Sequence, residues 1–281
     1  DTIGKIFPAN VVEPRVNANM LQVIVMAILL GFAIILVGEE KNSRVIQGFQ
    51  DLNDIFMKCM ELILRLSPIG VFCLLCPVIA ANGPAIIGSL AMVLLAAYIC
   101  YIIHMAVVYS LTVKAIGGLS PFEFFKNMFP AMIFAFSSSS SVGTLPINME
   151  CVEKMGVSKE VSSFVLPLGA TINMDGTAIY QGVCAIFIAS CYGIQLTLPQ
   201  MLTIILTATL ASIGTAGVPG AGMVMLAMVL TSVGLPVDGI ALVAGVDRIF
   251  DMGRTVVNIT GDASCCVVVH NLEKKKEMKN N

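Results

Sequence analysis

The chain contains several apolar stretches that are long enough to cross a lipid bilayer. A transmembrane helix needs about 20 consecutive, mostly apolar residues. The stretches cover about residues 20–38, 66–81, 86–113, 161–193, 197–231 and 239–269. No Lys or Arg occurs between Lys159 and Arg248, and the surface of a soluble domain would not tolerate such a gap. The sequence therefore predicts an all-α polytopic membrane protein that sits in a lipid bilayer.

The overall composition excludes several other classes. Hydrophobic residues make up 57% of the chain and charged residues 12%, and the net charge is -2. A basic patch is lacking, so we expect no nucleic-acid partner. The nine cysteines are scattered through apolar segments. Even the C-x-x-C of Cys73 and Cys76 lies in a hydrophobic stretch, so we interpret the cysteines as buried, reduced thiols rather than a redox centre.

Positive charge sorts the connections between the apolar stretches into two sets. Lys- and Arg-bearing connections should face the cytoplasm, and the connections around 81–85, 192–200 and 232–239 carry neither residue. The two sets are consistent only if the segments about 120–150 and 197–231 each return to the side from which they came. We therefore predict two re-entrant hairpins. The positive residues of the first set are Lys41, Arg44, Lys114, Lys126, Lys154, Lys159, Lys274, Lys275, Lys276 and Lys279.

Small and helix-breaking residues interrupt both predicted hairpins at their middle. Residues 137–146 read SSSSSVGTLP, and residues 212–222 read SIGTAGVPGAG. Non-helical backbone at membrane depth is tolerated only where it is buried in protein or lines a watery cavity. The shared SVGT and SIGT, each followed by a broken apolar segment, indicate an inverted repeat of hairpin plus helix. Paired interruptions of this kind point to the binding site of a transporter.

The last apolar stretch carries a stripe of charged and polar residues. At 100° per residue, Asp247, Asp251, Arg254, Asn258 and Asp262 fall within about 80° of one another on a helix. Each charge at the centre of a bilayer costs at least about 2.5–3.5 kcal/mol, which implies a function. We therefore expect the stripe to face the interior of the helical bundle.

Two interpretations of this stripe remain open. Arg254 and Asp251 could simply pair with each other inside the bundle. However, three carboxylates against one guanidinium cannot be neutralised internally, so cations or a ligand ammonium are needed. A sheltered Arg is also suited to hold a carboxylate with two hydrogen bonds.

A second polar break, NMDGT at residues 173–177, lies within the apolar span from about 161 to 188. A Gly flanked by Asp, Asn and Thr unwinds a membrane helix locally and frees backbone carbonyls. Together with Asn173, Asp175, Asn258 and Asp262, these carbonyls provide the oxygen ligands that hard cations prefer. A plain helix kink is the alternative.

The serine run could instead suggest nucleophilic catalysis, which needs a neighbouring base. His104 lies in a separate apolar span and His270 beside the lysine-rich tail, so neither is placed to serve it. Zinc and aspartyl protease motifs are also not visible. We therefore predict a transporter rather than an enzyme. A channel or a structural subunit is a further alternative for the protein. For the serine run itself, the simplest alternative is that it has no function.

At these residues the chain closely resembles the glutamate, aspartate, neutral amino acid and dicarboxylate cation symporter family, prokaryotic branch. The matching pieces are the serine-rich hairpin that ends in GTLP, the stretch LPLGATINMDGT at 166–177, the hairpin at 211–222 and the stripe at 247–262. Together they are highly specific, and the resemblance extends over essentially the whole chain.

The resemblance implies a homotrimer in a bacterial inner membrane, in which a static scaffold holds a transport domain that crosses the bilayer like an elevator. Residues 1–81 would be scaffold helices, residues 84–270 the transport domain and residues 271–281 a cytoplasmic tail. Family members begin with three further membrane helices, so we expect the chain to be incomplete at its N-terminus. Inverted repeats are already known in an archaeal member of this family, so the repeat follows from the resemblance as well as from the paired interruptions.

The resemblance also implies the roles of individual residues. Arg254 would hold the side-chain carboxylate of the substrate, and Asp251 its amino group. The rest of the pocket would be Ser140, Ser141, Thr177, Val218, Gly222, Thr255 and Asn258. One sodium site would use Asp262 and Asn258 with carbonyls of Gly169 and Asn173, a second the carbonyls of Thr171, Ser212, Ile213 and Thr215, and a third Asn173 and Asp175.

These roles predict sodium-coupled uptake of glutamate or aspartate, with no cofactor besides the sodium ions. A dicarboxylate has no ammonium to offset Asp251, whereas an amino acid does. The stripe also lacks a His or Glu that would suggest a proton carrier. A C4-dicarboxylate or cystine symporter, including a proton-coupled one, is the alternative.

Overall fold

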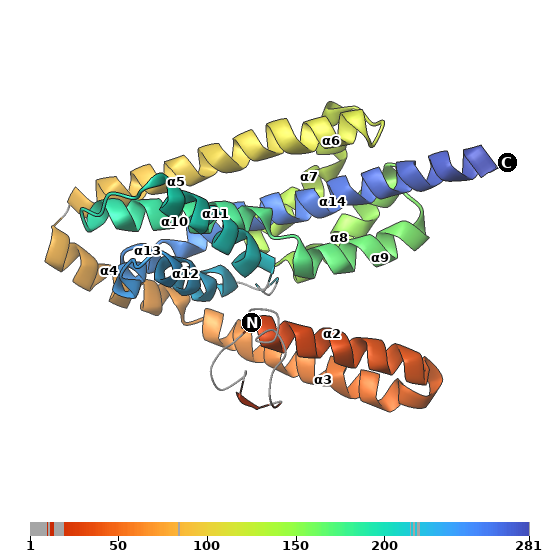
Figure 1. Cartoon of the computed structure of the whole chain (residues 1–281), viewed down its shortest axis with the longest axis horizontal. Helices are drawn as coiled ribbons and strands as arrows, with labels where there is room; N and C mark the ends of the chain where they lie inside the picture. Colours follow the sequence, from red (N-terminus) through yellow and green to blue (C-terminus); the bar gives the residue numbers. More distant parts are fainter. Residues whose placement is uncertain are drawn as a thin grey trace. The chain divides into compact units, whose positions relative to one another are not determined.

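The computed structural model describes residues 10, 12, 13, 20–83, 85–213, 215, 217 and 220–280. Every regular element in these ranges is helical, as the all-α prediction requires (Figure 1). The chain forms two compact units, residues 1–70 and 71–281. The helix α4 (Ser67–Asn82) contains the point of division. The predicted boundary between scaffold and transport domain at residues 81–84 remains a prediction.

The first unit consists of α2 (Met20–Val37), α3 (Glu39–Leu64) and the first residues of α4. Gly38, with φ of 98°, makes the turn between α2 and α3, and a left-handed residue of this kind commonly ends a helix. The helix α3 is not a continuous apolar run, and it was not among the predicted membrane-length stretches. Its apolar residues recur at helical spacing, and they are exposed: Val45, Phe49, Leu52 and Phe56.

Among the described residues of the second unit, two helical stretches are long and apolar enough to cross a membrane, Ile86–Ala115 and Lys159–Cys191. The first comprises α5 (Ala85–His104), a π-helical turn η2 (Met105–Tyr109) and α6 (Ser110–Ala115). The second comprises α9 (Lys159–Ile172) and α10 (Asp175–Cys191). The two helices are separated at residues 173–174, within the break predicted at residues 173–177.

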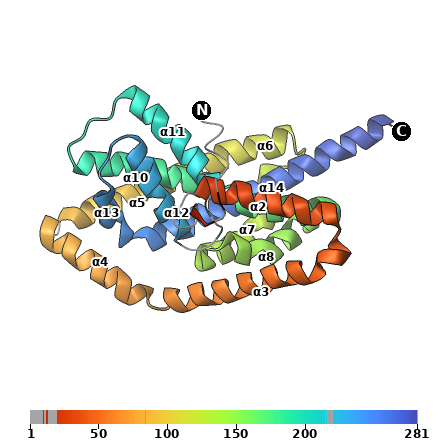
Figure 2. The same cartoon turned by 60° about the horizontal axis from the view of Figure 1, so that its bottom comes forward.

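The first predicted hairpin consists of α7 (Pro121–Ser138) and α8 (Ser141–Lys154), whose arms run side by side (Figure 2). The serine run forms its tip. Ser139 has φ of 55°, which ends α7 in a left-handed turn. The hydroxyl of Ser140 then accepts a hydrogen bond from the amide of Gly143 at 3.0 Å, which caps α8.

The second predicted hairpin consists of α11 (Leu198–Ile213) and α12 (Ala221–Ser232). The two tips meet, because the carbonyl of Gly217 accepts hydrogen bonds from the amide of Val142 at 3.4 Å and the hydroxyl of Ser140 at 3.3 Å. The arms of these two helical hairpins cover residues 121–138 and 141–154, and residues 198–213 and 221–232. Their re-entrant placement in a bilayer and the inverted repeat remain predictions.

The longest helix, α14 (Asp247–Asn280), is preceded by η3 (Val237–Gly239) and α13 (Ile240–Ala244). It packs against α5, α7, α8, α9 and α10, and so it joins the first hairpin to the broken helix (Figures 1 and 2). Close approach requires glycine here, because a Cβ at Gly253 would lie 2.9 Å from the rings of Tyr98 and Tyr101. The helix continues beyond residue 270, where the transport domain was expected to end.

Candidate functional site

The polar stripe of α14 is buried throughout. Because the helix packs against several others at once, this face has little access to solvent. The exposed fraction is 2% for Arg254 and 1% for Asp262, and the other three members are also buried: Asp247, Asp251 and Asn258. The helix therefore brings three carboxylates, one guanidinium and one amide into the interior of the second unit.

Arg254 lies at the centre of this stripe and makes two ion pairs. Its Nε donates to Oδ1 of Asp251 at 2.8 Å, and its Nη1 donates to Oδ1 of Asp247 at 3.2 Å. The guanidinium carbon lies 4.5 Å from the ring centroid of Tyr180, which is within the range of a cation–π interaction. In the described part of the chain, Nη2 of Arg254 is buried and has no hydrogen-bond partner.

The tip of the second hairpin covers this ion pair. The amide of Gly220 donates to Oδ2 of Asp251 at 2.8 Å, so the two oxygens of one carboxylate bind Arg254 and the hairpin. A Cβ at Gly222 would lie 2.8 Å from Nη1 of Arg254 and 3.2 Å from Cγ2 of Thr177. The backbone of the hairpin thus lies directly on the guanidinium.

Asn258 fixes the start of α10 to the middle of α14. Its Oδ1 accepts a hydrogen bond from the amide of Gly176 at 2.8 Å. Its Nδ2 contacts Sδ of Met174 at 3.1 Å and Oγ1 of Thr177 at 3.4 Å. A Cβ at Gly176 would overlap the backbone of Arg254, so glycine permits this close approach.

A small cavity of about 10 Å³ lies between these groups. Both hairpin tips, the break before α10 and the stripe of α14 contribute to its wall. Its lining residues are Ser139, Ser141, Met174, Thr177, Thr215, Gly217, Gly222, Asp251, Arg254, Thr255 and Asn258. Seven of the predicted substrate residues are among these, whereas Val218 lies outside the described residues and Ser140 reaches the tip of the second hairpin instead.

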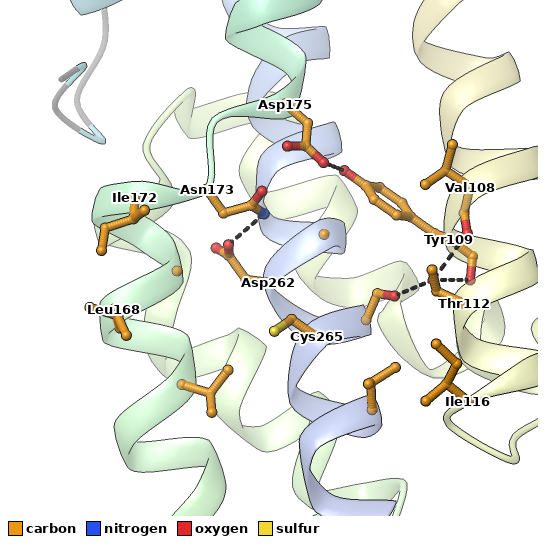
Figure 3. Close-up of a pocket in the computed structure, with 15 residues that line it drawn as sticks. Val108, Tyr109, Thr112, Ile116, Leu168, Ile172, Asn173, Asp175, Asp262 and Cys265 are labelled. Carbon is orange, nitrogen blue, oxygen red and sulfur yellow. Dashed lines mark hydrogen bonds between the residues drawn. The ribbon is translucent and has the colours of Figure 1, made fainter. Parts of the chain in front are cut away.

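A separate oxygen-rich cluster surrounds Asp262. Its Oδ1 accepts a hydrogen bond from Nδ2 of Asn173 at 2.9 Å (Figure 3). The same amide nitrogen donates to the carbonyl of Asn258 at 3.2 Å. A Cβ at Gly169 would lie 2.6 Å from Oδ1 of Asp262. The structure therefore brings together Asp262, Asn173, Gly169 and Asn258, the four residues predicted for one sodium site.

Asp175 is the first residue of α10 and faces a cleft that Asp262 and Asn173 also line (Figure 3). Its Oδ2 accepts a hydrogen bond from the hydroxyl of Tyr109 at 2.8 Å and lies 3.2 Å from Nε2 of His104. Asp175 and Asn173, predicted to share a sodium site, thus lie in the same cleft.

The other predicted sodium site consists of backbone carbonyls of Thr171, Ser212, Ile213 and Thr215, and it stays a prediction. Ser212 and Thr215 are buried at the end of α11, where the amide of Thr215 donates to the carbonyl of Ser212 at 3.0 Å. Thr171 is exposed, and its hydroxyl turns back to the carbonyl of Leu168 at 2.8 Å. The side chain of Ile213 is exposed as well. The second hairpin lies close to the end of α9, because a Cβ at Gly217 would lie 2.7 Å from the carbonyl oxygen of Ala170.

Reasoning from the sequence missed several residues that contact this site. Asp247 was placed on the stripe but not as a partner of Arg254, although its position seven residues earlier gave a signal. Tyr180 follows the polar break at 173–177 within one helical turn, but no sequence pattern predicted that its ring contacts Arg254. His104 and Tyr109 belong to a span to which no role in the site was assigned, and their contact with Asp175 depends on tertiary packing.

Comparison with known proteins connects this geometry to a family. The chain is 41% identical over 267 residues to excitatory amino acid transporter 2 of Homo sapiens, an alignment that covers 94% of this chain and 46% of that protein. It is 36% identical over 273 residues to the proton/sodium-glutamate symport protein of Bacillus subtilis (strain 168), covering 97% of this chain and 63% of the relative.

A third relative is the proton/glutamate-aspartate symporter of Escherichia coli (strain K12), 34% identical over 278 residues, covering 99% of this chain and 63% of the relative. The chain thus spans about half to somewhat under two thirds of the length of these relatives. The model of the sodium:dicarboxylate symporter family matches residues 1–272. This chain belongs to the sodium:dicarboxylate symporter family.

Proposed function

We propose that this chain is the substrate- and ion-binding part of a secondary active symporter that takes up an acidic amino acid, glutamate or aspartate, together with sodium. The observation that carries the proposal is the buried guanidinium of Arg254. It lies beside Asp251, beneath a hairpin tip, and its Nη2 has no partner among the described residues. A buried guanidinium with a free donor suits a carboxylate ligand.

The pair of Arg254 and Asp251 matches the charges of an acidic amino acid. The side-chain carboxylate of the substrate binds Nη2 and Nη1 of Arg254, and its ammonium replaces the hairpin amide at Oδ2 of Asp251. Thr177, Thr255 and Asn258 line the same cavity and donate hydrogen bonds to the rest of the ligand. The backbone at Ser140, Ser141, Val218 and Gly222 is assigned to the α-carboxylate.

Sodium coupling is supported by the surroundings of Asp262. This carboxylate is 1% exposed, and within the described residues it accepts one hydrogen bond, from Asn173. A buried carboxylate with so few donors is costly unless a cation neutralises it. Carboxylate, amide and carbonyl oxygens at Asp262, Asn173, Asn258 and Gly169 suit a hard cation. Asp175 is assigned to a further site, and Thr171, Ser212, Ile213 and Thr215 to another.

Access of the substrate to the cavity requires the second hairpin to move. The cavity volume of about 10 Å³ is far smaller than the roughly 300–1,000 Å³ of typical ligand pockets. The hydrogen bond between Gly220 and Asp251 joins the hairpin tip to its wall. The hairpin therefore opens by giving up this bond and closes again over the bound ligand.

We further propose the arrangement of the whole protein. Residues 1–81 form part of a static scaffold, and residues 84–270 form a transport domain that moves across the bilayer in an elevator-like step. The exposed apolar face of α3, with Val45, Phe49 and Phe56, supports contact with lipid or with neighbouring subunits of a homotrimer. Lys274, Lys275 and Lys276 near the end of α14 support a cytoplasmic C-terminus in a plasma membrane, or inner membrane in bacteria.

C4-dicarboxylate or cystine transport, coupled to protons, is the second candidate. The family name includes dicarboxylates, and the names of the Bacillus subtilis and Escherichia coli relatives include protons. Asp251 favours an amino acid, because a dicarboxylate brings a second negative charge and no ammonium to this carboxylate.

Uptake of radiolabelled glutamate and aspartate by the full-length protein in lipid vesicles tests the proposal. We expect saturable uptake that requires an inward sodium gradient and is competed more strongly by acidic amino acids than by cystine or succinate. Preferential binding of succinate would contradict the substrate assignment. Uptake that is indifferent to sodium but driven by a pH gradient would contradict the sodium assignment.

A further inference from the structure

His104 and Tyr109 both contact one oxygen of Asp175. The hydroxyl of Tyr109 donates to Oδ2 at 2.8 Å, and Nε2 of His104 lies 3.2 Å from the same atom. An ionised carboxylate can only accept hydrogen bonds, so His104 carries its proton on Nε2 in this contact. In the described part of the chain, Oδ1 of Asp175 accepts no hydrogen bond, and Asp175 lines the cleft (Figure 3).

The π-helical turn explains how two residues five positions apart reach the same atom. In a regular α-helix, residues five apart point about 140° away from each other. The turn over Met105–Tyr109 widens the helix between them, and such turns occur frequently at functional sites. The wider turn brings His104 and Tyr109 to one face, where their rings meet edge to face with 4.9 Å between the centroids.

The pair is also anchored to the helix that carries the candidate site. The hydroxyl of Tyr109 lies 3.2 Å from the carbonyl of Val257, next to Asn258. A Cβ at Gly261 would lie 2.6 Å from this hydroxyl and 2.6 Å from Nδ2 of Asn173. Tyr109 therefore touches Asp175 on α10 and the backbone of α14 close to Asn258 and Asp262.

We propose that His104 and Tyr109 are positioning residues for sodium: they hold Oδ2 of Asp175 so that Oδ1 is presented to a cation in the cleft. This inference rests on the proposed function, in which Asp175 belongs to a sodium site. The side chain of Asp175 is 36% exposed, so without the two contacts it would sample other rotamers. Partners that orient a ligand in this way typically change metal affinity about 10- to 100-fold when they are removed.

The experiment measures substrate binding to the full-length protein in detergent or vesicles as a function of sodium concentration. Tyr109→Phe removes one contact and keeps the ring. His104→Leu removes the other contact, while His104→Gln retains an N–H that can donate to Asp175. We expect Tyr109→Phe and His104→Leu to raise the half-saturating sodium concentration about tenfold, with substrate affinity at saturating sodium within about twofold of the parent. His104→Gln should stay close to the parent.

Tyr98→Phe is the matched control. It removes a tyrosine hydroxyl from the same helical stretch, and this hydroxyl also donates to the backbone of α14, at the carbonyl of Ile249 at 2.7 Å. We expect it to leave the sodium dependence unchanged. If Tyr98→Phe shifts the sodium dependence as much as Tyr109→Phe, or if His104→Gln and His104→Leu behave alike, the role of the pair is structural and the inference is overturned.

Asp175→Asn separates this inference from the proposed function. We expect it to raise the half-saturating sodium concentration, and we expect Tyr109→Phe to add little on top of it, because Tyr109 acts through Asp175. A shift with Asp175→Asn but none with Tyr109→Phe or His104→Leu overturns the inference and leaves the proposed function intact. Parent protein whose binding is independent of sodium contradicts the proposed function itself.

Discussion

Arg254 and Asp251 form an ion pair one helical turn apart, with 2.8 Å between Nε and Oδ1, and their side chains are only 2% and 5% exposed. Removing one partner of such a pair leaves an uncompensated buried charge, which costs about 3–5 kcal/mol. Asp247 shares the guanidinium at 3.2 Å, so two carboxylates face one cation here. A ligand with both a carboxylate and an ammonium can take up a contact with Arg254 and a contact with Asp251 at the same time.

Replacing Asp251 with Asn tests the assignment of the ammonium. The change removes the negative charge but keeps the size, so binding of glutamate or aspartate should weaken by about 10- to 100-fold, the equivalent of one charge-assisted hydrogen bond. Succinate, which has no ammonium, should bind no worse than to the parent. Competition binding in the full-length protein measures both. The control Asp238→Asn alters an exposed carboxylate in η3, and an equal loss in this variant would contradict the prediction.

The close approach of the second hairpin to Arg254 gives a steric prediction. A methyl group at Gly222 would lie 2.8 Å from Nη1 and 2.9 Å from Cζ of Arg254, so Gly222→Ala must displace the guanidinium or the hairpin. We expect weaker binding of acidic substrates, by about 5- to 150-fold, because an overpacked contact of this kind costs about 1–3 kcal/mol.

Gly182→Ala provides the control for this prediction. A Cβ at Gly182 on α10 would meet no atom within 4 Å, so this variant should bind substrate as the parent does. Isothermal titration calorimetry at saturating sodium compares the two variants. Parent-like affinity of Gly222→Ala would show that the hairpin does not lie on Arg254 in the bound state.

Asp262 provides a prediction for ion coupling. Asp262→Asn should raise the sodium concentration needed for half-maximal substrate binding by about tenfold or more. The variant loses a carboxylate oxygen ligand and the negative charge that offsets the cation. Gly169→Ala should act in the same direction, since its methyl group would lie 2.6 Å from Oδ1 of Asp262. Titration of binding with sodium at fixed substrate measures both shifts. An unchanged sodium dependence in Asp262→Asn would remove Asp262 from the ion site.

Periodicity along one helix was sufficient to predict much of this site. The 3.6-residue repeat groups Asp251, Arg254, Asn258 and Asp262 from the sequence alone, and the structure buries all four on α14. The polar residues at 173–177 also predicted a break, and α9 and α10 are separated within it, at residues 173–174. Such residues interrupt membrane helices where other parts of the protein provide hydrogen-bond partners for the backbone.

Contacts between different elements could not be predicted in this way. The ring of Tyr180 against Arg254 and the amide of Gly220 on Asp251 depend on how α10 and the second hairpin pack on α14. His104 and Tyr109 reach Asp175 only because of a π-helical turn, and a regular helical projection of the sequence would separate them. The helix α3 was not among the predicted membrane-length stretches because its apolar residues are periodic rather than continuous.

The central claim is that Arg254 selects acidic substrates, and the variant Arg254→Thr tests it most directly. The measurement is equilibrium binding of glutamate, aspartate, serine and alanine to the full-length protein at saturating sodium. We predict that the affinity of the variant for acidic substrates is lower than that of the parent by about 10- to 100-fold or more, because a charge-assisted hydrogen bond worth about 1.5–3 kcal/mol is lost. Serine and alanine should still bind, or bind newly, since their ammonium and α-carboxylate retain Asp251 and the hairpin amides. If Arg254→Thr binds glutamate or aspartate as tightly as the parent does, Arg254 is only a structural partner of Asp247 and Asp251, and the substrate assignment is wrong.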